Sequence, residues 1–135
     1  MLRKIGGVLL GLLIAALLVQ LAEMLVHQLY PPPPGTNMND FNEVKKFVAA
    51  LPLTALVLVL AGWLLATFAG TFVAARVGRG VVPGYVLGAF LLAAGIVNSV
   101  VIPQPVWFSA VSFVIYIAMS VVGARLGRPA LQGTT

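Results

Sequence analysis

The chain has 135 residues, of which 61% are hydrophobic and 8% are charged, with eight Lys or Arg against three Asp or Glu. A soluble domain is about 25% charged, so this sequence has too few charges to cover a water-facing surface and indicates an integral membrane protein. The absence of cysteine excludes disulfide scaffolds, thiol redox enzymes and thiolate metal sites. We expect no cofactor and no metal. We also expect no nucleic-acid partner, because the positions of the basic residues explain the net charge of +5 by membrane topology, as described below.

Four apolar stretches, at residues 5–29, 49–75, 82–102 and 106–124, are each near or above the roughly 20 residues that cross a bilayer. Short connections make sequential helices antiparallel neighbours. The sequence therefore predicts an all-α fold in which residues 1–135 form a single domain of four transmembrane helices.

The first stretch begins like a signal peptide, with Arg3 and Lys4 ahead of an apolar run. Cleavage after Ala22 needs a small residue two positions earlier, where the chain has Gln20. The apolar run also continues past Ala22. We therefore expect this stretch to remain as the first membrane helix.

Residues 30–48 form a loop that we expect on the outer side of the membrane. Prolines 31–34 cannot continue the first helix, and Asn39 or Asp40, with Glu43 in capping-box register, predicts the start of a short helix. Its apolar face carries Phe41, Val44, Phe47 and Val48, and its polar face carries Asn42, Lys45 and Lys46. Such a helix suits three arrangements: flat on the outer interface, docked on the protein's own helix ends, or presented to a partner.

Small residues recur every four positions in the first two membrane helices, which allows two backbones to approach closely. These residues are Gly7 and Gly11 in the first helix, and Gly62, Ala66, Gly70 and Ala74 in the second. We expect them to pack inside the bundle, and a contact between two copies of the chain is the alternative.

Two pairs of segments in the chain are similar to each other. LLIAALLVQ at 12–20 matches FLLAAGIVN at 90–98, and VAARVGR at 73–79 matches VGARLGR at 122–128. A duplicated helical hairpin explains both matches and predicts a parallel repeat with a pseudo-twofold axis along the membrane normal. Chance similarity between apolar, alanine-rich helices is the alternative.

Basic residues gather on one side of the predicted membrane. Six lie near helix ends on that side, namely Arg3, Lys4, Arg76, Arg79, Arg125 and Arg128. The other side has only Lys45 and Lys46, accompanied by Asp40 and Glu43. This asymmetry predicts that both termini are cytoplasmic and that the arginines act as topology determinants and anchors for lipid phosphate.

Polar residues at membrane depth are the candidate functional residues, because an ionisable group there is costly unless it is paired or hydrated. Gln20, Glu23 and His27 follow one face of the first helix, and Asn98 and Ser99 lie at similar depth in the third. We expect these five residues to form a cluster. It is either a proton or cation site based on Glu23 and His27, or a hydrogen-bond network that joins the hairpins.

Four short motifs are spread along the chain: YPPPPG at 30–35, LP at 51–52, GTFVAAR at 70–76 and PQPVWF at 103–108. With these motifs the sequence resembles a group of short, four-helix bacterial inner-membrane proteins that have no assigned activity. The resemblance implies the fold and the inner-membrane location. It carries over no catalytic residue.

Three functions remain compatible with the sequence. We favour a non-catalytic accessory subunit or scaffold, which needs only close helix packing and an exposed outer loop. An oligomeric transporter or channel for protons or a small solute, using Glu23 and His27, is the alternative, and a lipid-modifying enzyme is the third. We expect no enzyme activity, and we expect membrane lipids, other membrane subunits or further copies of the chain as partners.

Overall fold

The structure, a computed structural model, describes residues 2–31, 34–37, 39–101 and 104–129. These residues form five helices and no strand: α1 (Leu2–Leu29), α2 (Phe41–Ala50), α3 (Leu53–Gly78), α4 (Val81–Val101) and α5 (Val106–Gly127). All but α2 are long and apolar enough to cross a membrane. The predicted all-α fold with four candidate membrane spans is therefore confirmed.

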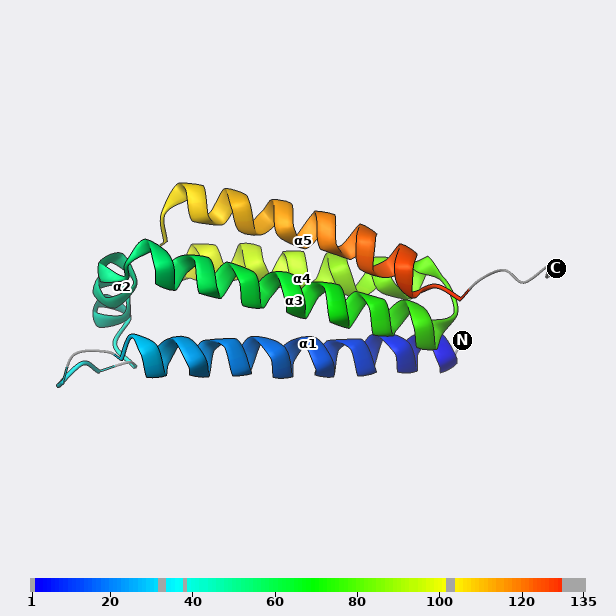
Figure 1. The fold of residues 1–135 in the computed structure, drawn as a ribbon, viewed down its shortest axis with the longest axis horizontal. Coiled ribbons are helices and arrows are strands. Elements are labelled where there is room, and N and C mark those ends of the chain that lie inside the picture. Colours follow the sequence, from blue (N-terminus) through cyan, green and yellow to red (C-terminus); the bar gives the residue numbers. More distant parts are fainter. Residues whose placement is uncertain (1, 32–33, 38, 102–103, 130–135) are drawn as a thin grey trace.

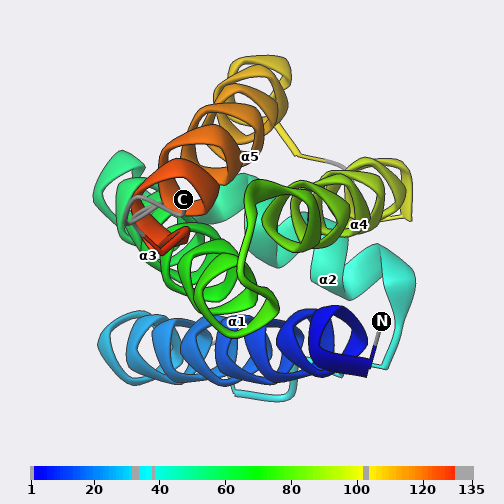
Figure 2. The same ribbon diagram turned by 90° about the vertical axis from the view of Figure 1, so that its right-hand side faces the viewer.

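The four long helices run side by side, and α2 lies across one end of them (Figure 1). α3 is the central helix, because it packs against α1, α4 and α5, whereas α1 and α4 share only a small contact. Seen along the bundle, α1 lies on one side of α3, and α4 and α5 lie on the other (Figure 2). The start of α1 and the end of α5 are at the end opposite α2 (Figure 1).

The core lies mainly between α3 and α5. Its largest buried members are Leu56, Leu60, Trp63, Phe108 and Tyr116. A second, polar tie joins the same two helices: the buried hydroxyl of Thr71 lies 2.7 Å from the carbonyl oxygen of Thr67 and 3.3 Å from that of Met119 on α5. A threonine hydroxyl can be buried in this way because it bonds a carbonyl of its own preceding turn.

Small residues bring the backbones of α1 and α3 into contact. A Cβ atom built on Gly70 would lie 2.8 Å from the carbonyl oxygen of Gly11, and one built on Gly7 would lie 2.7 Å from that of Ala74. Nearer to α2, Gly62 faces Ala22 in the same way, and Ala66 is 1% exposed. The two small-residue rows thus face each other within one chain.

The second hairpin uses the same type of contact. Side chains of α5 occupy the space beside the glycines of α4, with Ala124 against Gly84, Ser120 against Gly88 and the Tyr116 ring against Gly95. Any side chain at these glycines would overlap its neighbour on α5. The close approach of α4 and α5 therefore depends on glycine at these positions.

Several helix ends differ from the predicted ones. The second membrane helix begins at Leu53 and not at residue 49, because Leu51 before Pro52 is extended, so residues 49 and 50 belong to α2. α1 begins at Leu2, and α3 and α5 continue past the predicted ends at 75 and 124. α3 ends where Arg79 takes a left-handed conformation with φ of 58°. The predicted end of the third span at residue 102 lies outside the described residues.

The outward faces of the bundle are apolar. Leu9, Leu13 and Leu17 of α1 are 55–60% exposed, and Val114 and Ile117 of α5 are 64% and 55% exposed. A contiguous apolar surface of this extent is unstable in water, whereas hydrocarbon solvates it well. The exposed side chains therefore agree with a membrane location.

The glycine contact generates a stability prediction. We expect Gly11→Leu to lower the free energy of unfolding by about 2 kcal/mol or more, because the new side chain overlaps the Gly70 carbonyl and the Leu87 side chain. Thermal unfolding followed by circular dichroism in detergent measures this change. Gly6→Leu is the matched control, since nothing lies within 4 Å of a Cβ at that position. Equal unfolding temperatures for the two variants would contradict the described contact.

Candidate functional site

Asp40 is the N-cap of α2, and its Oδ1 accepts a hydrogen bond of 2.9 Å from the backbone N–H of Asn42. Of the two predicted caps, the structure therefore uses Asp40 and not Asn39. The capping box is not closed as predicted, because Glu43 Oε2 accepts instead from the backbone N–H of Asn37 at 2.8 Å. The Glu43 carboxylate thus ties the preceding loop to the first turn of α2.

α2 lies across the protein's own helix ends (Figure 1), and its side chains approach them around a shared cavity. Val44, Phe47 and Val48 face the bundle, and the Phe47 ring lies 6.1 Å from the ring of His27 on α1. The side chain of Phe41 lies outside the described residues. Asn42, Lys45 and Lys46 are exposed on the opposite face, as the pattern predicts.

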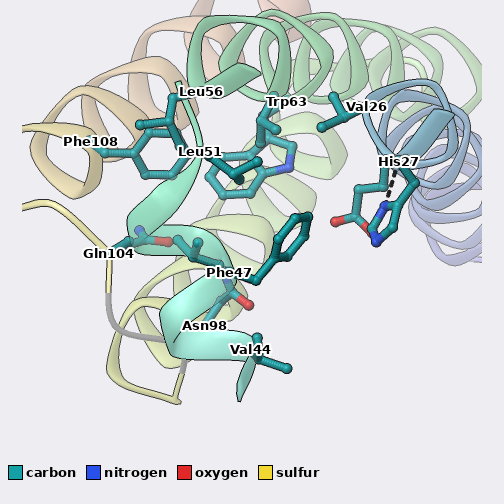
Figure 3. A pocket seen from close by; sticks show the side chains of 13 residues that line it. Val26, His27, Val44, Phe47, Leu51, Leu56, Trp63, Asn98, Gln104 and Phe108 are labelled. Atoms are coloured by element: carbon teal, nitrogen blue, oxygen red, sulfur yellow. Dashed lines mark hydrogen bonds between the residues drawn. The ribbon is translucent and has the colours of Figure 1, made fainter. Parts of the chain in front are cut away.

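A cavity of about 220 Å³ lies between α2 and the ends of the long helices. We call it the end cavity; it is lined by Val44, Phe47 and Val48 of α2 and by Glu23, Val26, His27, Leu51, Leu56, Val59, Trp63, Asn98, Gln104 and Phe108. Figure 3 shows His27 of α1 on one side, Phe108 on the other and Phe47 of α2 between them. α2 is therefore the roof of this cavity.

A second cavity, of about 250 Å³, lies between α1 and α4. This lateral cavity is lined by Ala15, Val19, Glu23, Trp63, Ala66, Thr67, Leu91, Ala94, Gly95, Asn98 and Tyr116. Ala94 and Glu23 are also exposed at the protein surface, so the cavity opens sideways between the two helices. The two cavities meet at Glu23, Trp63 and Asn98, which line both.

Aromatic rings form the wall shared by the two cavities. Trp63 is 8% exposed; its ring lies 5.4 Å from Phe108 in an edge-on contact and 6.0 Å from Tyr116 in a stacked contact. Its indole nitrogen is turned towards α1 (Figure 3). Tyr116 fits behind it because Gly95 has no side chain. Local sequence patterns give no signal for this group, because the rings come from separate helices.

The structure brings four of the five predicted polar residues together around Glu23. Glu23, His27 and Asn98 line the end cavity. Gln20 shares a third hollow, on the surface of α1, with Glu23, Met24, His27 and Gln28. Ser99 Oγ donates to the carbonyl oxygen of Ile96 in its own helix at 2.8 Å.

The hydrogen bonds of this group remain within single segments. His27 Nδ1 lies 2.9 Å from the backbone carbonyl oxygen of Glu23, so His27 bonds the main chain of Glu23 and not its carboxylate. Gln104 Nε2 donates to Ser109 Oγ at 2.9 Å, close to the start of α5. These bonds orient His27 and Gln104 beside the end cavity and leave the Glu23 carboxylate to face both cavities.

The six basic residues outside α2 lie at the opposite end of the bundle, around the start of α1 and the ends of α3 and α5. The Arg76 guanidinium lies 5.4 Å from the centre of the Phe72 ring, and Arg125 Nε donates to the Tyr85 hydroxyl at 3.4 Å. Arg79 and Arg128 follow the last residues of α3 and α5. No Lys or Arg lines either cavity among the described residues.

Among the described residues, no group of three His, Cys, Asp or Glu side chains is placed to hold a metal ion. No family model, no curated protein and no solved structure matches the chain. The chemistry of the site is therefore inferred from its own residues: one carboxylate, one imidazole, two amides and an aromatic wall.

The cap of α2 generates a prediction about the roof of the end cavity. A ten-residue helix is marginal by itself, and replacing an N-cap Asp by Ala costs about 1 kcal/mol. We expect Asp40→Ala to speed hydrogen exchange of the α2 amides about fivefold. Asn39→Ala should leave it unchanged, because only its backbone N–H is bonded. The opposite result would identify Asn39 as the cap.

Proposed function

We propose that this protein is a non-catalytic membrane component that binds a small solute in the end and lateral cavities. The observation that carries the proposal is the position of Glu23, which lines both cavities at their junction with Trp63 and Asn98. Small-molecule sites are typically concave and mostly apolar, with a few polar groups that fix the ligand. This pair of cavities has that composition.

The cost of a carboxylate at this position supports a binding role. An ionisable side chain within a membrane helix costs several kcal/mol unless a partner or water compensates it. His27 uses its described hydrogen bond on the Glu23 main chain, so it does not neutralise the carboxylate by direct contact. A solute with a complementary donor or charge supplies the missing partner.

Close backbone contacts separate the lateral cavity from a further surface hollow, which lies between α1 and α4 at the opposite end of the bundle. The lateral cavity extends down to Ala15 and Thr67, and one turn further the backbones of Gly11 and Gly70 meet. Passage of a solute across the protein would require α1 and α3 to separate at this contact. The arrangement therefore supports binding from the α2 end or from the side more directly than conduction of protons or solute.

An accessory role is compatible with the same site. The exposed polar face of α2, with Asn42, Lys45 and Lys46, and the apolar outward faces of α1 and α5 remain available to other subunits or copies. In that arrangement the bound solute would accompany the assembly, and the chain itself would need no catalytic step.

Native mass spectrometry of protein extracted mildly from its own membrane tests the proposal. We expect a small molecule retained by the wild type and by Glu43→Gln but lost from Glu23→Gln. The two variants make the same chemical change, and Glu43 lies outside both cavities. Retention that is equal in all three proteins would contradict the role of Glu23. A foreign subunit at fixed ratio without a small molecule would favour the accessory role alone.

We also propose that the basic end of the bundle faces the cytoplasm and that α2 lies at the outer surface of a bacterial inner membrane. Six basic residues near one end, against Lys45 and Lys46 near the other, support this orientation. The resemblance to short bacterial four-helix proteins agrees with it.

The two hairpins are proposed to descend from one duplicated unit. The repeated VAARVGR and VGARLGR segments end the second helix of each hairpin, α3 and α5. In both hairpins the glycines of the first helix face small residues of the second, with Gly7 against Ala74 and Gly84 against Ala124. The aligned segments place Gly7 over Tyr85 and Ala74 over Gly123, so these contacts share a type but not a position, and the repeated sequence is what supports the duplication.

The absence of native cysteine allows a direct test of orientation. A membrane-impermeant maleimide should label Asn42→Cys in intact cells and should label Gly80→Cys only after the membrane is opened. Both positions are outside the long helices, and neither change alters the charge. Labelling of Gly80→Cys alone in intact cells would reverse the proposed orientation.

A further inference from the structure

We propose that the ligand is a single-chain amphiphile with an ammonium head, held with the head at Glu23 and the alkyl chain in the lateral cavity. This inference rests on the proposed function and specifies its ligand class. It uses two features together: the charge at the junction of the cavities, and the shape and lining of the lateral cavity.

The negative charge of the Glu23 carboxylate favours a cationic head group. Glu23 is the only acidic residue, and no Lys or Arg is present, among the described residues that line either cavity. The cationic residues Arg3 and Lys4 are about 30 Å away along α1, at 1.5 Å per residue. Lys45 and Lys46 are on the exposed face of α2. An anionic head would therefore face an uncompensated carboxylate, whereas an ammonium group neutralises it.

The aromatic wall favours the same charge. Trp63 lies at the junction of the cavities with Glu23, and Phe47 lies in the roof of the end cavity. A cation is attracted to the face of an aromatic ring, most strongly to that of Trp, and this attraction grows when water is excluded. Asn98 and Gln104 add amide groups whose oxygens carry partial negative charge and attract a cation.

The apolar lining of the lateral cavity favours an alkyl chain as the tail of the ligand. Its lining below Glu23 consists mainly of small and aliphatic side chains, including Ala15, Val19, Ala66 and Ala94. It opens between α1 and α4, which places its mouth against the hydrocarbon of the bilayer. From Glu23 to Ala15 it extends about 12 Å along α1, at 1.5 Å per residue. An alkyl chain can enter from the membrane with its head at the level of the carboxylate.

The experiment uses Trp63 as the reporter, because it lines both cavities. Trp107→Phe removes the other tryptophan and keeps an aromatic ring at that position. The protein is placed in nanodiscs of phosphatidylglycerol, a lipid without an ammonium group. Decyltrimethylammonium, decyl maltoside, decyl sulfate and tetramethylammonium are then titrated while Trp63 fluorescence is recorded.

We expect a saturable change with decyltrimethylammonium, with affinity at least about tenfold higher than for the other three probes. In the same background, Glu23→Gln should weaken binding at least about tenfold, and Glu43→Gln should leave it unchanged. Equal affinities for decyl sulfate and decyltrimethylammonium, or no effect of Glu23→Gln, would overturn the ammonium assignment.

A second pair of variants tests the tail independently of Glu23. Ala94 and Ala93 are both exposed on α4, but only Ala94 lines the lateral cavity. Ala94→Leu should weaken binding of decyltrimethylammonium several-fold, and Ala93→Leu should not. Equal effects of the two variants would overturn the placement of the alkyl chain. The fluorescence of Trp63 without amphiphile should also be the same in nanodiscs that hold one copy and in nanodiscs that hold two. A difference between them would assign the cavity to a second copy of the chain and overturn the proposal.

Lipid composition distinguishes the two sources of such a head group. If the natural ligand is a membrane lipid, replacing part of the phosphatidylglycerol by lysophosphatidylethanolamine should raise the apparent Kd of decyltrimethylammonium. If it is a free amphiphile whose head carries no phosphate, the Kd should stay constant, which excludes the phospholipid source and keeps the ammonium assignment that decyltrimethylammonium binding supports. Failure of all the cationic probes, with a solute still retained by mass spectrometry in a Glu23-dependent manner, would overturn this inference and leave the proposed function intact.

Discussion

The backbone contact between Gly11 of α1 and Gly70 of α3 is the constraint on which the rest of the structure depends. It brings two membrane helices to a distance that no larger side chain would permit. α3 then provides the surface on which α4 and α5 pack, and α1 is left with only a small contact to α4. The lateral cavity occupies the space between α1 and α4, and the same contact bounds it on the side away from α2.

α2 completes this arrangement from outside the bundle. Its apolar face is too small to form a core of its own, but it lies over the ends of the long helices and lines one side of the end cavity. The site therefore combines three different environments: an exposed polar helix face, a partly open cavity with amides and an aromatic wall, and an apolar slot that opens between α1 and α4. A carboxylate at the junction of the last two is the feature that gives the cavities a chemical preference.

The spans, the close-packing glycines and the shared face of Glu23 and His27 could be predicted from the sequence, because each depends on spacing within one helix. The composition of the site could not, because it depends on how each helix is rotated about its axis after packing. Gln20 lies three residues before Glu23 yet lines neither cavity, and Ser99 follows Asn98 yet bonds its own helix. Trp63 faces Glu23 only because α1 and α3 meet through glycine and alanine. The sequence places the start of α3 too early, at residue 49, because apolar residues continue across Pro52, whereas the helical backbone is interrupted there.

The turn at Arg79 and Gly80 has a mechanical consequence. These two residues are the whole connection between α3 and α4, so the helices cannot separate at that end. Asn98 lies about 27 Å along α4 from this turn, at 1.5 Å per residue. A tilt of α4 about the turn therefore displaces Asn98 by about 0.5 Å per degree, by simple leverage over that length. The width of the lateral cavity therefore changes with small changes in the tilt of α4, because this part of α4 forms one of its walls.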